Sequence, residues 1–218
     1  MDRDTDPQRG NEEVEAATAG VELCRSGHRR LLETVNGLDD EVVRRPSLLP
    51  DWSVGHVLTH LARNADGHAR RLEGALGGSE VPRYPGGMAE RASDIEAGAA
   101  RPARELAADV AASAERLEQV WARSADAGWP SRELLADDTW RTPESPWRRL
   151  REVEVHHADL GLEYGPEDWP DEYLRWELPR ALETVPGRIA DPGDARRFLA
   201  WLIGRRGDPG GIELGPWS

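Results

Sequence analysis

Three side chains able to bind a metal or move a proton lie at helical spacing within residues 149–165. Glu152, His156 and Asp159 are separated by four and three residues, so a helix places them on one face. A carboxylate and an imidazole one turn apart can both reach a single cation, as in the metal sites of helical bundles. Asp159 is then a candidate hydrogen-bond partner for His156. The alternative is a helix with a hydrogen-bonded histidine and a solvated glutamate, because E-x-x-x-H is a short pattern.

A second group of histidines lies in residues 53–76. His56, His60 and Asn64 follow one another at steps of four and form a polar stripe beside an apolar one. Either histidine could complete a metal site, and spacing does not choose between His56 and His60. Cys24 and His28 lie on the apolar stripe of an earlier helix. We interpret both as packing residues, since no partner that would activate Cys24 is evident.

The elements that must position these residues follow from apolar periodicity. Steps of three and four predict helices over residues 11–36, 53–76, 102–125 and 146–161, the last capped by Ser145 and followed by Gly161 and Gly165. Residues 77–100 are rich in glycine and proline and predict a loop, in which Tyr84 and Arg91 could line a pocket. We therefore predict a mainly α protein with a four-helix bundle over residues 11–165. A short C-terminal segment, 166–218, contains further helices over 171–184 and 195–205 and packs on the bundle.

The composition excludes several classes of function. The 218 residues carry a formal net charge of −13, and all 28 basic residues are arginine. An acidic chain without a basic run is a poor match for nucleic acid or an anionic membrane, and no apolar run approaches the roughly 20 residues of a membrane span. Cys24 is the only cysteine, which is typical of a reducing compartment. We expect a cytoplasmic protein, monomeric or weakly homodimeric.

Several motifs resemble those of one family. The segments 49–53 (LPDWS) and 57–62 (VLTHLA) resemble the first signature of the mycothiol-dependent maleylpyruvate isomerase family. Segment 151–161 (REVEVHHADLG) resembles its second signature, and 202–205 (LIGR) its third. Tyr84 and the segment 94–98 (DIEAG) are similar to its linker. The resemblance extends over nearly the whole chain after residue 15.

The resemblance implies both a fold and a site. The fold is a DinB-like four-helix bundle, of the DinB-like metalloenzyme superfamily, followed by a small α/β domain. Because no alternating strand pattern precedes Ala195, we expect a helical or reduced α/β segment there. The resemblance also implies zinc bound by a histidine of the second helix and by a glutamate and a histidine of the fourth. Carried onto this chain, the metal ligands are His60, Glu152 and His156. Arg205 becomes the catalytic and cofactor-binding arginine, and Tyr84 a further cofactor-binding residue.

Two imidazoles and one carboxylate leave zinc one open position, as in catalytic sites. A thiol there loses its proton at neutral pH, and the resemblance implies that this thiol is mycothiol. The implied reaction, in aromatic catabolism, is addition of the thiolate to maleylpyruvate, bond rotation and elimination to fumarylpyruvate, with Arg205 holding a substrate carboxylate. The partners are then a small-molecule substrate and a low-molecular-weight thiol. Two alternatives are a mycothiol S-transferase acting on another electrophile and a non-enzymatic metal-binding bundle.

Overall fold

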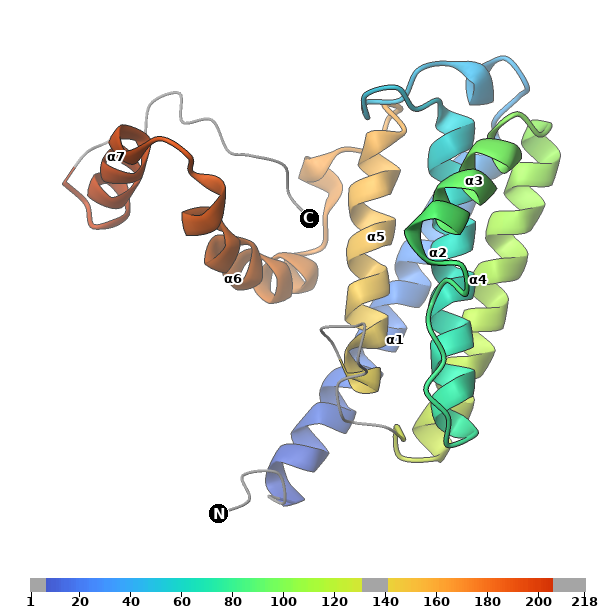
Figure 1. The fold of residues 1–218 in the computed structure, drawn as a ribbon, viewed down its shortest axis with the longest axis horizontal. Coiled ribbons are helices and arrows are strands. Elements are labelled where there is room, and N and C mark those ends of the chain that lie inside the picture. The colour runs from blue at the N-terminus through green and yellow to red at the C-terminus, as the bar shows by residue number, and fades with distance from the viewer. Residues whose placement is uncertain (1–6, 131–140, 206–218) are drawn as a thin grey trace. The chain divides into compact units, whose positions relative to one another are not determined.

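Four long helices form the bundle in Figure 1: α1 (Pro7–Asn36), α2 (Val54–Leu76), α4 (Ala103–Asp126) and α5 (Ser145–Asp159). The computed structural model describes residues 7–130 and 141–205. Within these residues there are seven α-helices and no strand, which confirms the predicted mainly α, DinB-like bundle. The α/β alternative for the C-terminal segment finds no support in residues 166–205. Helix α1 begins at Pro7, four residues before the predicted start.

Contacts between side chains fix the order and direction of the helices. The chain runs parallel in α2 and α4, because three ion pairs join them in the same order along both helices: Arg63–Asp109, Asp66–Arg116 and Glu73–Arg123. Helix α5 packs against α2 in the opposite direction and against α1 in the same direction. The four helices therefore form a closed ring in the order α1, α4, α2, α5, with α2 beside α5.

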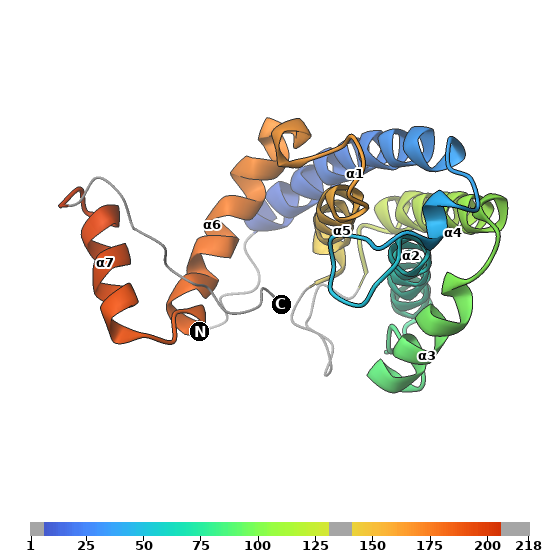
Figure 2. The ribbon, with the colours of Figure 1, turned by 90° about the horizontal axis from the view of Figure 1, so that it is seen from above.

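The crossover that makes α2 and α4 parallel contains a helix that the sequence prediction missed. Residues 77–100 were predicted as a loop, but α3 (Gly87–Ala99) lies within them, on the outside of the bundle beside α2 (Figure 2). Only Ile95 and Ala99 are buried on this helix, so its apolar stripe is too short to recognise. The end of α3 approaches α2 closely: a Cβ on Gly55 would lie 2.2 Å from the carbonyl oxygen of Ala99.

The serines at the starts of α2 and α5 play different parts, one as a helix cap and the other as a buried hydrogen-bond partner. Ser53 caps α2, and its hydroxyl accepts a hydrogen bond from the backbone N–H of His56. The prediction for Ser145 was wrong, because Ser145 is the first residue inside α5. Its hydroxyl instead accepts a hydrogen bond from the indole of Trp121 and contacts His68 Nδ1 at 2.9 Å. Gly161, with a φ of 67°, follows the end of α5 as predicted.

Buried aliphatic side chains fill the centre of the ring. Leucines from all four helices have no exposed surface, among them Leu31, Leu61, Leu106, Leu117 and Leu150. Truncating a leucine in such a position costs about 2–5 kcal/mol, whereas each exposed ion pair contributes at most about 1 kcal/mol. Apolar packing therefore holds the bundle together, and the ion pairs mainly define its register.

The chain divides into two compact units, residues 1–169 and 170–218. The first contains the bundle with three short 3-10 helices, η1 (Val42–Arg44), η2 (Thr142–Glu144) and η3 (Pro166–Asp168). The second contains α6 (Asp171–Arg188) and α7 (Pro192–Leu202), in place of the predicted helices over 171–184 and 195–205. None of the described helices is long and apolar enough to cross a membrane.

Candidate metal centre

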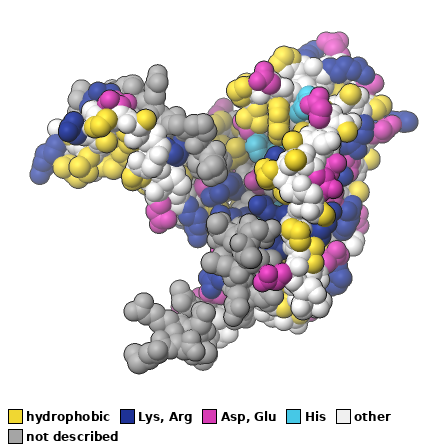
Figure 3. All heavy atoms as spheres, viewed as in Figure 1, with side chains coloured by type: hydrophobic (Ala, Val, Ile, Leu, Met, Phe, Trp, Pro, Cys, Tyr) yellow, Lys and Arg dark blue, Asp and Glu magenta, His cyan; other side chains and the backbone are white. Residues whose placement is uncertain are grey.

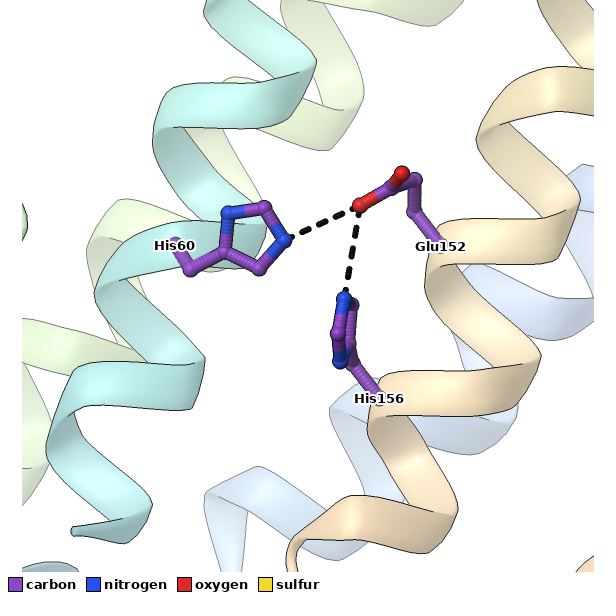
Figure 4. A group of neighbouring side chains, drawn as sticks. All are labelled: His60, Glu152 and His156. Atoms are coloured by element: carbon purple, nitrogen blue, oxygen red, sulfur yellow. Dashed lines mark hydrogen bonds and ion pairs between the residues drawn. The ribbon is translucent and has the colours of Figure 1, made fainter. Parts of the chain in front are cut away.

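His60, Glu152 and His156 meet between α2 and α5 (Figure 4). His60 Nε2 lies 2.9 Å from Glu152 Oε2, and His156 Nε2 lies 3.5 Å from the same oxygen. The two imidazole rings are perpendicular, with centroids 4.6 Å apart. The predicted proximity of His60 and His156 is thus confirmed, and three potential ligand atoms lie within 4.8 Å of one another.

The protonation states of His60 and Glu152 suit a cation. The pKa of His60 is lowered to about 4, mainly by burial and also by the nearby positive charge of Arg91. The ring is therefore neutral at pH 7. Burial alone would raise the pKa of Glu152, but hydrogen bonds from His156 and His60 outweigh it and hold this pKa well below its usual range. A neutral imidazole and a carboxylate therefore face one point.

His156 carries a proton in the metal-free protein. Its burial would lower the pKa, but hydrogen bonds to Asp159 and Glu152 outweigh this and raise the pKa to about 9. The predicted contact with Asp159 is present, at 2.8 Å from Nδ1. A carboxylate behind Nδ1 directs Nε2 towards the other two ligands, as in many metal-bound histidines.

The cluster fits a divalent metal by its donors and by its access. Two imidazole nitrogens and one carboxylate oxygen are a ligand set of catalytic zinc sites. His60 is 3% exposed, but the side chains of Glu152 and His156 are 27% and 19% exposed. Histidine atoms also reach the surface on the face of the molecule drawn in Figure 3. A metal bound by these three side chains could therefore contact a small molecule from solvent.

Buried polar contacts continue along the α2–α5 seam behind the cluster. Arg149 has no exposed surface, and its guanidinium donates hydrogen bonds to the Leu61 carbonyl, Asn64 Oδ1 and His28 Nε2. Arg149 therefore joins α5 to both α2 and α1, one turn from Glu152. Sequence periodicity did not predict this role, because nothing in the pattern marks an arginine as buried.

The opposite face of α5 is anchored to α1 and to the segment that follows α5. The fully buried Glu154 accepts a hydrogen bond from Arg30 at 2.6 Å and another from the hydroxyl of Tyr164. His157 stacks on the Tyr164 ring, with centroids 3.9 Å apart, and contacts Thr34 at 2.9 Å. These contacts fix the rotation of α5 about its axis, and hence the direction in which Glu152 and His156 point.

His56 lies outside the cluster. Its Nδ1 contacts the hydroxyl and backbone N–H of Ser53, and its Nε2 lies 3.2 Å from Glu96. The geometry thus separates the two histidines that sequence spacing left open. Trp52 lies against both, with its ring 5.6 Å from the His60 ring and 6.2 Å from the His56 ring, and forms a wall of the site that the spacing argument did not single out.

Tyr84 and Arg91, from the crossover, reach the same region. Arg91 Nη2 lies 2.8 Å from His60 Nδ1, and its guanidinium is 5.8 Å from the centroid of the Tyr84 ring. Arg91 was only a possible pocket residue on sequence grounds, because the helix that presents it was not predicted. A role for Tyr84 in cofactor binding stays a prediction.

Arg205 belongs to the second compact unit, three residues after the end of α7. Gly204 has a φ of 69°, and the backbone N–H groups of Gly204 and Arg205 bond to the carbonyls of Trp201 and Ala200. This is a Schellman motif, which holds the Arg205 backbone while its side chain is exposed. The predicted participation of Arg205 in the site stays a prediction, and Arg206 lies outside the described residues.

Cys24 and His28 form a second cluster with Glu118. Cys24 Sγ lies 3.8 Å from His28 Nε2, and His28 Nδ1 lies 2.7 Å from Glu118. The order of a thiol, an imidazole and a carboxylate is that of an activated nucleophile, a partnership that the sequence did not reveal. However, Cys24 has no exposed surface, and burial raises the pKa of its thiol. The packing interpretation therefore holds.

Comparison with known proteins places this geometry in context. Residues 24–161 match the family model described as the mycothiol maleylpyruvate isomerase N-terminal domain. Two solved structures are similar, a mycothiol-dependent maleylpyruvate isomerase and a histidine-to-alanine mutant of a mycothiol-dependent maleylpyruvate isomerase. Their TM-scores are 0.68 and 0.67 and their identities 27% and 26%, over 73% of this chain. The match spans 66% of those chains. Comparison with curated proteins gave no match.

Proposed function

Because the chain belongs to the family of the mycothiol maleylpyruvate isomerase N-terminal domain, we propose that it is a zinc- and mycothiol-dependent maleylpyruvate isomerase. The reaction is the cis–trans isomerisation of maleylpyruvate to fumarylpyruvate. The observation that carries the proposal is the convergence of His60, Glu152 and His156 from two helices within the region that matches the family. We further propose that the enzyme acts on small molecules in the cytoplasm.

The three clustered residues hold the metal, and the bundle keeps them in place. When bound, zinc supplies a positive charge that stabilises the thiolate form of the thiol cofactor at neutral pH. Asp159 orients the His156 ring, Arg149 ties α5 to α2, and Glu154 fixes the rotation of α5. Trp52 covers one side of the site with an apolar ring, which limits the access of water.

Arg205 and Tyr84 are proposed to bind the substrate and the thiol cofactor. Maleylpyruvate carries two carboxylates, and a guanidinium pairs with a carboxylate through two parallel hydrogen bonds. The exposed Arg205 side chain, on a backbone fixed by the Schellman motif, can provide such a pair and contribute to catalysis. Tyr84 offers a ring and a hydroxyl beside Arg91.

A mycothiol S-transferase is the second candidate. The family match ends at residue 161, so it includes the metal cluster but not the segment that contains Arg205. The thiol chemistry therefore has stronger support than the identity of the electrophile. The same cluster would activate the same thiol for transfer to another acceptor.

The test is an assay of the purified protein loaded with zinc. Mycothiol is supplied together with maleylpyruvate or, separately, with a panel of electrophiles, and both fumarylpyruvate and thiol conjugates are measured. The proposal expects fumarylpyruvate formation that depends on mycothiol and is lost in the folded His156→Ala protein. Conjugation of an electrophile without isomerisation would favour the S-transferase. No reaction in any arm, with zinc bound, would favour a non-enzymatic metal-binding protein.

A further inference from the structure

Arg91 is a cation beside the metal cluster that has no carboxylate partner among residues 7–130 and 141–205. It is half-buried on α3, with its Nη2 on His60 Nδ1 and its guanidinium facing the Tyr84 ring. No carboxylate in the described part of the chain lies within ion-pair distance of it. Five arginines that bridge neighbouring bundle helices do have such a partner: Arg25, Arg30, Arg63, Arg116 and Arg123. Arg149 differs from Arg91, because it is fully buried and its guanidinium is held by oxygen acceptors of α2, the Leu61 carbonyl and Asn64 Oδ1.

The absence of a carboxylate has a cost in this setting. A guanidinium that is partly removed from water loses hydration, and a carboxylate normally replaces it. The chain has 41 acidic residues against 28 basic ones, so acidic partners are plentiful. Within the described residues, Arg91 contacts a neutral imidazole and an aromatic face directly at the site, so its guanidinium can bind the carboxylate of a ligand.

The contact with His60 depends on which ring nitrogen carries the proton. Arginine can only donate hydrogen bonds, so His60 Nδ1 must accept from Arg91, and Nε2 carries the proton that faces Glu152. If Nε2 binds a metal, the proton of the neutral ring lies on Nδ1. Two donors would then face each other, so the Arg91 contact and metal binding through Nε2 exclude one another.

The other histidine of the cluster shows the contrast. His156 Nδ1 faces the carboxylate of Asp159, an acceptor that remains suitable when Nε2 binds a metal. Arg91 cannot play that part behind His60. The chain thus has a metal-supporting partner behind one histidine and, behind the other, a cation that metal binding would release.

We propose that Arg91 is a substrate-binding residue that holds a carboxylate of the substrate and becomes available when the metal displaces it from His60. The inference rests on the proposed function and adds a second carboxylate-binding residue to Arg205. The Tyr84 ring keeps the released guanidinium near the site through a cation–π contact. Metal and carboxylate binding are then positively coupled, and the coupling is reciprocal.

The test uses maleate as a simple dicarboxylate and needs no thiol. Calorimetric titration compares the wild type, Arg91→Met and Arg104→Met, each with and without zinc. Arg104 is an exposed arginine in the first turn of α4, so its variant matches the change in net charge. Arg91→Lys keeps the charge without the planar fork, and circular dichroism checks that each variant folds.

In the zinc-loaded proteins, we expect Arg91→Met to bind maleate about tenfold or more weakly than the wild type, as for the loss of a charge-assisted pair. Arg104→Met should bind as the wild type does, and Arg91→Lys should fall between. The gain in maleate affinity on zinc loading should also be larger in the wild type than in Arg91→Met. This difference isolates the release of Arg91 from any direct contact between maleate and zinc.

Equal maleate affinity of the loaded wild type and Arg91→Met, or no binding to the loaded wild type, would overturn the proposal. An equal gain from zinc in both proteins would overturn the release step. The outcomes are separable from those for the proposed function. If the wild type lacks isomerase activity but Arg91→Met still weakens maleate binding, the reaction is wrong and the Arg91 inference stands. If the wild type isomerises maleylpyruvate but Arg91→Met binds maleate as tightly as the wild type, the proposed reaction stands and the Arg91 inference is wrong.

Discussion

Zinc binding to this protein should release one proton near neutral pH, and that proton should come from His156. In the metal-free protein His60 is neutral and keeps its one ring proton when it binds a metal, and Glu152 is ionised, so neither releases a proton to solvent. The pKa of His156 is raised to about 9, mainly through hydrogen bonds to Asp159 and Glu152 that outweigh its burial. The metal must displace the His156 proton in order to bind Nε2.

The size of the effect follows from that pKa. At pH 7, two units below it, about one molecule in 100 has a neutral His156, so zinc binds about 100-fold more weakly than at high pH. This factor corresponds to about 2.7 kcal/mol. Zinc affinity should therefore fall about tenfold for each unit of pH below 9 and level off above it. Asp159→Asn removes a cause of the raised pKa, so its zinc affinity should depend less on pH between 7 and 9.

The assay is calorimetry of zinc binding at pH 7 in buffers of different ionisation enthalpy, which counts the protons released. Competition with a chelator at several pH values gives the slope of the affinity. His56→Ala is the control, because His56 lies outside the cluster, and it should behave as the wild type. Release of no protons at pH 7, or a slope that Asp159→Asn leaves unchanged, would refute the assignment.

Three further predictions concern the ligands, the C-terminal arginine and the stability of the fold. His156→Ala should weaken zinc binding by more than the 10–100-fold typical of losing an outer partner, as measured by chelator competition. His56→Ala should keep its zinc and lose about 1 kcal/mol of stability, because the hydrogen bond from the Ser53 backbone N–H to His56 Nδ1 is lost. Arg205→Lys should lower turnover about tenfold or more and Arg206→Lys should change it little, if Arg205 binds a carboxylate through its planar fork; equal small effects would contradict that role. Burial lowers the pKa of His68, so below pH 6.5 only the unfolded chain takes up this proton. In urea unfolding, His68 should add a stability loss approaching about 1.4 kcal/mol per pH unit below pH 6.5, so the stability of His68→Gln should fall less steeply with decreasing pH than that of the wild type.

The long helices were predictable because their apolar stripes are long. In α2, residues such as Leu58, Leu61 and Leu72 repeat over six turns, and a period of 3.6 is unmistakable over that length. Helix α3 could not be found in the same way. It buries only Ile95 and Ala99, and the glycines before it indicate a turn. Tertiary contact with α2, rather than local pattern, decides that residues 87–99 are helical.

The site was predictable in part. The E-x-x-x-H spacing placed Glu152 and His156 on one face, and the structure adds the contact with His60. Spacing could not choose between His56 and His60, because both belong to one stripe of α2. The choice depends on the neighbours of each ring. Both nitrogens of His56 contact other residues, Ser53 and Glu96, whereas His60 faces Glu152 of α5. Arg91 was beyond reach because its position depends on α3.

The same polar stripe explains why a metal site and a stable core can share one helix seam. Along α2, His60, Asn64 and His68 step by four residues and face α5. A sequence pattern gives no reason to bury this stripe rather than expose it, since polar side chains at steps of four usually face solvent. It is buried because each member meets a complementary group from α5: Glu152, Arg149 and Ser145 in turn. A buried polar group that keeps its hydrogen bonds costs little, whereas one that loses its partner costs about 1–3 kcal/mol. The buried pairs Asn64–Arg149 and His68–Ser145 thus fix the register of α2 against α5. The pair His60–Glu152 differs, because His156 adds a second imidazole there and the side chains of Glu152 and His156 reach solvent. A metal can therefore bind at this end of the stripe.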